Sequence, residues 1–267
     1  MAFAGTILVT GSTDGVGRRV VEKLAAEGSR LLVHGRDGTR GKEVVEAVDR
    51  AGGSAEFLRA DFASLDDVRD LAHAIKAEYG HLDVLINNAG IARVDSARRE
   101  SHDGHELHFA VNYLAPVLLT HLLRPVLGGE KPSRVVNLTS AAQDPIDFDD
   151  VMLERHYSGY RAYGQSKLAD IMFTFDLARE WDGTNITVNC LHPGDHLDTV
   201  PVRAAGIRPS HSADYGADNT IALATGAGRS GDYFHGRRKS RASSQAYDGA
   251  SRRRLRELTM ELIGLAA

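Results

Sequence analysis

The chain has 267 residues, of which 42% are hydrophobic and 25% charged, and its formal net charge is -4. This length fits a single α/β domain, and the hydrophobic share is enough for a full core. The slightly acidic balance gives no overall field that would attract nucleic acid or an anionic membrane. Cys190 is the single cysteine, which excludes a disulfide within the chain and fits a reducing compartment.

The N-terminal segment "MAFAGTILVTGS" has no basic region followed by a cleavage-type tail, so we expect no signal peptide. The apolar stretch "NYLAPVLLTHLL" is interrupted by Pro116 and His121 and is too short to span a bilayer. We therefore expect a cytoplasmic protein that has no membrane contact.

Strand-like and helix-like segments alternate along the chain. Strands are expected at 6–10, 30–35, 54–61, 83–90, 134–140 and 185–194. Helices are expected at 16–28, 38–53, 64–80, 103–128 and 159–181. Strands that alternate with helices of about a dozen residues or more are typical of βαβ units. We predict one α/β domain over 1–267, a Rossmann-type doubly wound parallel sheet of about seven strands with helices on both faces.

The first expected strand runs into a glycine-rich turn, "TGSTDGVG", at residues 10–17. Gly11, Gly15 and Gly17 would allow a tight turn, close approach of a phosphate, and close packing of helix on strand. The following helix would offer free N–H groups to a pyrophosphate. The spacing G-x-x-x-G-x-G differs from the common G-x-G-x-x-G fingerprint, and an ordinary helix entry is the alternative. The strand–turn–helix context favours a dinucleotide site.

Further motifs follow in a fixed order: "NNAG" (87–90), Asn112, Ser140, "YGQSK" (163–167) and "HPG" (192–194). With the glycine turn, this order resembles the short-chain dehydrogenases/reductases over essentially the whole chain. The segments "DGHELHFAVNYLAP" and "YGQSKLADIMFT" resemble the retinol-dehydrogenase-like branch and its bacterial relatives. Many retinoid enzymes carry an N-terminal membrane anchor, which we do not expect in this chain, so a retinoid substrate is not carried over.

Tyr163 and Lys167 are four residues apart and would share one helix face. A nearby ammonium lowers the pKa of a phenol and makes it a usable acid or base. The resemblance implies that Tyr163 exchanges a proton with the substrate oxygen, to which Ser140 donates a hydrogen bond. It also implies that Lys167 lowers the Tyr163 pKa and binds the nicotinamide ribose, while Asn112 holds a water connected to Lys167. The implied activity interconverts a carbonyl and an alcohol by hydride transfer.

The resemblance implies cofactor contacts in the turns that follow the strands and on the catalytic helix: Gly11, Thr13, Asp14, Gly15, Val16, Gly17, Arg36, Asp61, Phe62, Asn88, Ala89, Gly90, Tyr163, Lys167, Pro193 and Gly194. NAD-preferring relatives carry an acid at the end of the second strand. Here Gly35 and then Arg36 follow, and arginine suits a 2′-phosphate. Asp14 and Asp37 would repel a phosphate. We therefore expect NADP(H) rather than NAD(H), which stays the alternative.

Ser140 and Tyr163 stand 23 positions apart, wider than the family usually shows. We interpret residues 143–160 as an acidic inserted loop with a short helix, close to helices through which many relatives dimerise. A changed interface would leave a monomer or a homodimer. The insert, residues 91–100 and an expected mobile loop at 195–215 should select a small carbonyl or alcohol substrate.

Three features suggest other functions. The histidines at 102, 105 and 108 do not converge on one side of a helix, and His192 is expected only to pack, so we predict no metal site. The basic segments 236–244 and 251–257 lack an aromatic ladder, so we expect a solvated face and no nucleic acid. A catalytically silent nucleotide-sensing or scaffold protein on the same fold is the alternative function.

Overall fold

The computed structural model describes residues 3–94, 97–226 and 228–266. Its centre is a sheet with the strand order β3-β2-β1-β4-β5-β6-β7-β8. Neighbouring strands are parallel except for β7 and β8, which pair antiparallel. The strands are β1 (Thr6–Val9), β2 (Arg30–Gly35), β3 (Ser54–Arg59), β4 (Val84–Asn87), β5 (Ser133–Leu138), β6 (Ile186–His192), β7 (Tyr233–His235) and β8 (Arg238–Lys239). The predicted doubly wound α/β sheet is confirmed, with the short β8 as an addition.

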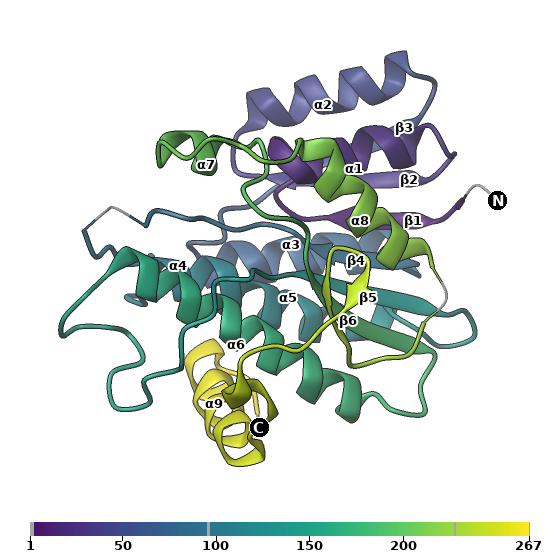
Figure 1. The fold of residues 1–267 in the computed structure, drawn as a ribbon. Helices are drawn as coiled ribbons and strands as arrows, with labels where there is room; N and C mark the ends of the chain where they lie inside the picture. The colour runs from purple at the N-terminus through teal and green to yellow at the C-terminus, as the bar shows by residue number, and fades with distance from the viewer. Residues whose placement is uncertain (1–2, 95–96, 227, 267) are drawn as a thin grey trace.

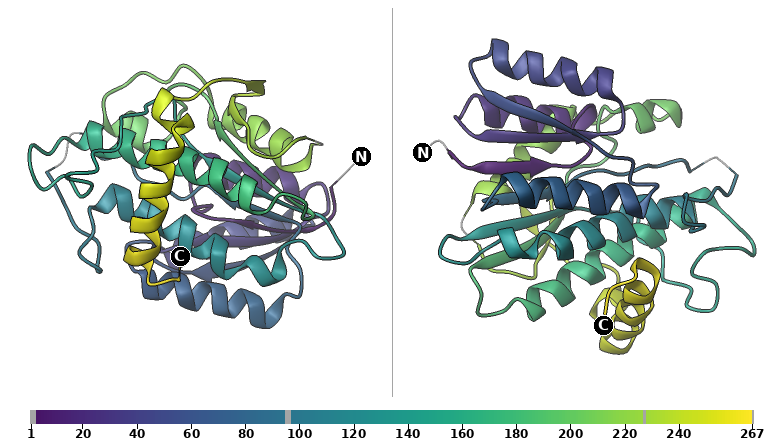
Figure 2. Two further views of the ribbon diagram at one scale, coloured as in Figure 1. Left: turned by 90° about the horizontal axis from the view of Figure 1, so that it is seen from below. Right: turned by 180° about the vertical axis from the view of Figure 1, so that it is seen from behind.

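Helices cover both faces of the sheet (Figure 1). Side chains alternate along each strand, so that Ile7 and Val9 join one core and Leu8 the other. The first core includes helices α1 (Gly15–Ala25), α2 (Gly38–Arg50) and α8 (Ala213–Thr225). The second includes α3 (Leu65–Glu78), α5 (Ala115–Leu122), α6 (Gly159–Glu180) and α9 (Gly249–Ile263). Figure 2 shows α9 crossing the outer side of α6.

Polar side chains define where the helices begin. The Asp37 carboxylate accepts from the Thr39 N–H at 3.0 Å, and the Ser64 hydroxyl accepts from the Asp67 N–H at 3.2 Å. The Ser158 hydroxyl caps α6 in the same way. Such caps satisfy N–H groups that have no partner within the helix. They place these starts within one residue of the sequence predictions at 38, 64 and 159.

The prediction of one helix over 103–128 is wrong. The helical region begins later, as α4 (Leu107–Phe109), and continues through a π-helical turn, η1 (Ala110–Leu114), into α5 and a 3₁₀ turn, η2 (Arg124–Val126). The Ala115 N–H bonds the Ala110 carbonyl, five residues back. Pro116 has no N–H to give the Asn112 carbonyl, which weakens the α-helical alternative. The π turn therefore carries Asn112, and π turns are frequent at functional sites.

The short helix expected within 143–160 is also wrong, because the structure forms only turns between β5 and α6. This insert is nevertheless anchored. The Ile146 N–H donates to Gln245 Oε1 at 2.6 Å, and the Asp147 N–H donates to Gln165 Oε1 at 3.0 Å. The loop at 195–215 contains its own helix, α7 (Val200–Ala204). Within the described ranges, no helix is both long and apolar enough to cross a membrane.

Candidate active site

The predicted motifs gather beyond the carboxyl ends of β1, β4, β5 and β6, where open α/β sheets bind their ligands (Figure 1). The glycine turn follows β1, "NNAG" includes the end of β4, Ser140 follows β5, and "HPG" includes the end of β6. Helix α6 supplies Tyr163 and Lys167 from one face of the sheet. The motifs, which are far apart in the sequence, thus lie along one edge of the sheet.

The glycine turn packs directly against the "NNAG" segment. A Cβ at Gly11, whose φ is +61°, would lie 2.6 Å from Ala89 Cα, and one at Gly17 would lie 2.4 Å from Asn88 Nδ2. The Asn88 amide donates to the carbonyls of Thr10 at 2.8 Å and Gly11 at 3.0 Å. Asn88 therefore shapes the turn from the side. Glycine leaves the backbone close to any ligand there, which fits a pyrophosphate.

His34 is a residue that the sequence reasoning missed. Its Nδ1 accepts from the Gly11 N–H at 3.0 Å, and its Nε2 lies 3.2 Å from the Ala60 carbonyl. The ring stacks on Phe62 with centroids 4.4 Å apart. Burial lowers the pKa of His34 to about 4, against the hydrogen bond to Ala60 and the charge of Asp61. A neutral imidazole thus connects the glycine turn to the turn after β3. In the sequence, the only indication of this role is that His34 lies in the segment "LLVHG", directly before Gly35.

A side chain at the end of β2 would have to displace Thr13. A Cβ at Gly35 would lie 2.7 Å from Thr13 Cγ2. Arg36 is exposed beyond it, and Arg40, which the sequence reasoning missed, lies one turn into α2. Arg40 Nη1 is 3.3 Å from Asp14 Oδ2, and its Nε is 3.7 Å from Asp37 Oδ2. The two acids expected to repel a phosphate therefore share a cation.

Asp14 has a second role as the cap of α1. Its Oδ1 accepts from the Gly15 N–H at 2.7 Å. A Cβ at Gly15 would lie 3.4 Å from Thr199 Cγ2, so the 195–215 loop reaches the start of α1. After β6, the Asn219 amide donates to the Pro193 carbonyl at 2.9 Å and fixes the segment that contains Gly194. These contacts place the 195–215 loop beside the start of α1 and connect the segment after β6 to α8.

The four predicted catalytic residues come from the π turn η1, the segment after β5, and helix α6. The Ser140 hydroxyl is close enough to the Tyr163 phenol to oppose the rise in the pKa of Tyr163. The buried Lys167 donates through Nζ to the Leu138 carbonyl at 2.7 Å. A Cβ at Gly90 would lie 3.2 Å from Asn112 Oδ1 and 3.6 Å from Lys167 Nζ. Asn112 and Lys167 therefore lie together beside Gly90, and Tyr163 is one turn before Lys167 on α6; the catalytic roles of the four residues stay a prediction.

Asn112 is held from both sides. Its Oδ1 accepts from the Ile91 N–H at 2.8 Å, and its Nδ2 donates to the Ile91 carbonyl at 3.0 Å and to Ser166 Oγ at 2.9 Å. The side-chain amide therefore joins the "NNAG" turn to α6, and its hydrogen-bonding capacity is largely used by protein. Pro116 offers the Asn112 carbonyl no α-helical N–H, so this carbonyl is the group that could accept from a water.

The expected lowering of the Tyr163 pKa is wrong for this structure. Burial raises the pKa of Tyr163, and the nearby Ser140 hydroxyl only opposes that rise. Burial likewise lowers the pKa of Lys167, against the charge of Asp170. Desolvation disfavours both charged forms and outweighs the attraction that the i, i+4 spacing suggested. Tyr163 is therefore a protonated phenol at neutral pH.

Behind Tyr163 lies a buried polar cluster that the sequence did not reveal. The rings of His108 and Tyr163 have centroids 6.5 Å apart. His108 Nδ1 is 2.9 Å from Glu106 Oε1, and its Nε2 accepts from the Arg93 N–H at 3.1 Å. Glu106 also caps α4 by accepting from the Phe109 N–H. His102 and His105 precede the helix that contains His108, so the three histidines do not lie on one helix.

Comparison with known proteins agrees with this geometry. The profile of the family described as "short chain dehydrogenase" matches residues 5–204. Human Retinol dehydrogenase 13 is 34% identical, over 98% of this chain and 85% of that protein. The chain therefore belongs to the short chain dehydrogenase family, an oxidoreductase family on a Rossmann-type fold, and it resembles the retinol dehydrogenases within it.

Two bacterial relatives are also similar. A Streptomyces sp. (strain C5) protein, named as a candidate daunorubicin C-13 ketoreductase, DnrU, is 36% identical over 97% of this chain and 92% of its own. A crystal structure of a short chain dehydrogenase from Burkholderia cenocepacia J2315 in complex with NADP superposes with a TM-score of 0.72. It is 27% identical and covers 88% of this chain and 97% of its own.

Proposed function

We propose that the protein is an NADP(H)-dependent oxidoreductase that interconverts a small carbonyl compound and its alcohol. The observation that carries this proposal is the convergence of Asn112, Ser140, Tyr163 and Lys167 beside the glycine turn. A silent scaffold would need neither a buried lysine nor a hydroxyl pair at this edge. That alternative has no observation in its favour.

The chain's own residues would act as follows. Bound NADPH supplies a hydride to the carbonyl carbon. Tyr163 gives its proton to the substrate oxygen, and Ser140 stabilises the charge that develops there. Lys167 and the Asn112 carbonyl then provide a route by which the phenol regains a proton. The carbonyl gains one hydride and one proton and becomes the alcohol, and NADPH becomes NADP⁺.

Reduction fits a protonated Tyr163, and a phenol is protonated at neutral pH even without the raised pKa. A protonated phenol is ready to donate, whereas oxidation of an alcohol first needs a phenolate. We therefore propose that the protein reduces a carbonyl compound in the cytoplasm, as a monomer or a homodimer.

NADP(H) is favoured over NAD(H) by the end of β2. Gly35 cannot be replaced by an acid without moving Thr13, and Arg36 is exposed at the place where a 2′-phosphate is bound in NADP-dependent relatives. Arg40 lies near Asp14 and Asp37 and reduces the repulsion that these carboxylates would exert on the 2′-phosphate. Its guanidinium is also a second possible donor to that phosphate, next to Arg36. The NADP complex of the Burkholderia relative supports the same preference.

Fluorescence titration with NADPH and NADH tests the cofactor. We expect tighter binding of NADPH, and a loss of at least about tenfold in Arg36→Ala, because one charge-assisted phosphate contact contributes about 1.5–3 kcal/mol. Arg50→Ala, at the far end of α2, is the matched control and should bind NADPH as the wild type does. Equal loss in both variants, or tighter binding of NADH, would contradict the assignment.

Oxidation of NADPH with a panel of aldehydes and ketones tests the reaction. The panel includes retinal and daunorubicin, because two relatives are named for retinol dehydrogenation and for daunorubicin C-13 ketoreduction. We expect turnover with at least one class. Tight NADPH binding without any turnover, in either direction, would instead favour the catalytically silent alternative.

A further inference from the structure

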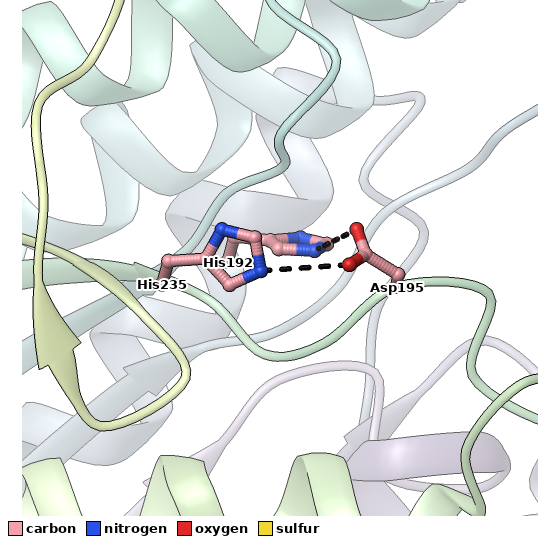
Figure 3. Close-up of side chains that lie close together, drawn as sticks. All are labelled: His192, Asp195 and His235. Atoms are coloured by element: carbon pink, nitrogen blue, oxygen red, sulfur yellow. Dashed lines mark hydrogen bonds and ion pairs between the residues drawn. The ribbon is translucent and has the colours of Figure 1, made fainter.

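A separate cluster of side chains lies at the ends of β6 and β7, outside the proposed catalytic group. Figure 3 shows His192, Asp195 and His235 with their polar atoms turned toward one another. His192 Nε2 is 3.0 Å from Asp195 Oδ1, and His235 Nε2 is 3.5 Å from Asp195 Oδ2. One ligand atom from each residue can be chosen so that all three lie within 4.8 Å of one another.

The backbone fixes the two histidines independently of this contact. His192 and His235 are register partners on neighbouring parallel strands, so their side chains leave the same edge on the same face. The Gly236 N–H donates to the His192 carbonyl at 2.9 Å and extends this pairing. The two imidazoles are therefore neighbours because of the sheet, and their centroids are 4.7 Å apart.

Asp195 is positioned by the loop that follows β6. Its carbonyl accepts from Ser210 Oγ at 2.9 Å, and the next residue, His196, adopts a left-handed φ of 40°. The Ser210 N–H returns to the His196 carbonyl at 3.0 Å. A left-handed conformation is costly for a non-glycine residue, so the surrounding contacts must hold this turn. The turn sets the carboxylate opposite both rings.

The spacing of the polar atoms allows a metal ion to bind between them in place of the direct contacts. The His235–Asp195 separation of 3.5 Å is long for a hydrogen bond. Ligand atoms about 2 Å from a tetrahedral Zn²⁺ lie about 3.3 Å apart. The separations of 3.0 and 3.5 Å, which run to the two different oxygens of Asp195, lie near that distance. A set with one ligand atom from each residue spans up to 4.8 Å, so binding would draw these side chains closer together. The Asp195 side chain is 55% exposed and that of His192 is 9% exposed, so an ion can enter from solvent on one side and is enclosed on the other.

We propose that His192, Asp195 and His235 bind one first-row divalent transition metal ion of the Zn²⁺ type. Two imidazole nitrogens and one carboxylate oxygen form a ligand set that such ions prefer. Three protein ligands leave a coordination position for water or for a donor atom of another molecule. This proposal departs from the sequence prediction of no metal, because the two histidines are 43 positions apart in the sequence and only the strand pairing brings them together.

The ion would lie on the same side of the sheet as the proposed catalytic group. Tyr233 precedes His235 by two residues on β7, and alternate residues of a strand share a face about 7 Å apart. The Tyr233 hydroxyl donates to the Ser140 carbonyl at 3.3 Å. The bound ion would also join the 195–215 loop to the sheet edge next to Ser140.

Calorimetric titration of the metal-stripped, tag-free protein with ZnCl₂ tests the site, and Co²⁺ serves as a spectroscopic probe. We expect one strong Zn²⁺ site per chain and the visible absorption of four-coordinate Co²⁺. The Zn²⁺ affinity should fall at least tenfold in His235→Ala and in Asp195→Asn, and the Co²⁺ absorption should be lost in both variants. His73→Ala, on the exposed face of α3, is the matched control and should keep both.

Several outcomes would overturn the proposal. The absence of a strong site in the wild type would leave the cluster as a hydrogen-bonded network. Equal binding in His235→Ala and His73→Ala would mean adventitious binding by the chain's 12 histidines. A melting temperature measured without metal identifies a variant that fails to fold, in which case His235→Ser replaces it. NADPH titration of the same samples keeps this result separate from the proposed function.

Discussion

His34 allows a prediction in which the structure fixes both sign and size. Its ordinary pKa is 6.5, and burial lowers the folded-state pKa to about 4. Between these pH values the imidazole of His34 binds a proton in the unfolded chain but not in the folded chain, so the free energy of unfolding decreases as the pH falls. The gap corresponds to about 3 kcal/mol in total, and to about 2 kcal/mol between pH 7 and pH 5.

The perturbation is His34→Asn, which does not titrate and keeps an oxygen near the place of Nδ1, where the Gly11 N–H donates. Urea unfolding of the wild type and the variant at pH 7 and pH 5 gives the free energies of unfolding. The stability advantage of the wild type over the variant should shrink by about 2 kcal/mol on going from pH 7 to pH 5. Asp170 titrates in the same range, but it is present in both proteins and cancels.

His73→Asn, on the exposed face of α3, is the control and should differ from the wild type by the same small amount at both pH values. A wild-type advantage over His34→Asn that is unchanged between pH 7 and pH 5 would refute the reasoning. It would mean that His34 is either protonated in the fold or open to water, and that the glycine turn is not tied to Ala60 through a neutral ring.

Three further changes test other parts of the site. Gly35→Asp should weaken NADPH binding by tenfold or more, as measured by fluorescence titration, because its Cβ would meet Thr13 at 2.7 Å and its charge would face a phosphate; unchanged affinity would contradict the proposed place of the ribose. Asn112→Ala should lower the free energy of unfolding by about 1–3 kcal/mol, because the Ile91 N–H and carbonyl lose their partners, and should slow turnover; a fully active, equally stable variant would disprove the assigned role. Burial raises the pKa of Asp170 to about 7, so the wild type loses stability as the pH rises and this carboxyl ionises more readily in the unfolded chain. In urea titrations, Asp170→Asn should therefore gain stability relative to the wild type between pH 5 and pH 8, and a constant difference would contradict this.

The sheet and the order of the motifs could be predicted because both depend on local patterns. Buried parallel strands are continuous apolar runs such as "TILV" and "VLIN", and the helices between them begin at capping residues. The family's motifs sit at the ends of these elements. Their convergence follows from the parallel topology, in which all carboxyl ends share one edge.

The π turn around Asn112 could not be read from periodicity. Its residues, Ala110–Leu114, are all buried, and so are most of those in α5, so neither helical face is marked by polar residues. Pro116 was the available signal, since it denies an α-helical partner to the Asn112 carbonyl. The supposed helix within 143–160 failed for a related reason, because that insert is held by distant groups such as Gln245 rather than by its own pattern.

The roles of His34 and His235 depend on distant contacts. His34 acts through Gly11 and Ala60, and His235 meets His192 through strand register. The lowered Tyr163 pKa failed because spacing reveals a neighbouring charge but not the desolvation that opposes it. Of the segment 91–100, expected to help select the substrate, residues 95–96 lie outside the described part of the chain.

The central claim is that Tyr163 is the proton donor in an NADPH-dependent reduction. The most direct measurement is the rate of NADPH oxidation by the wild type and by Tyr163→Phe, with the best carbonyl compound from the panel and with NADPH affinity measured on the same samples. We expect turnover to fall by at least about 100-fold in the variant, the usual size of a general-acid contribution, with NADPH affinity unchanged. Turnover in Tyr163→Phe equal to that of the wild type would contradict the account.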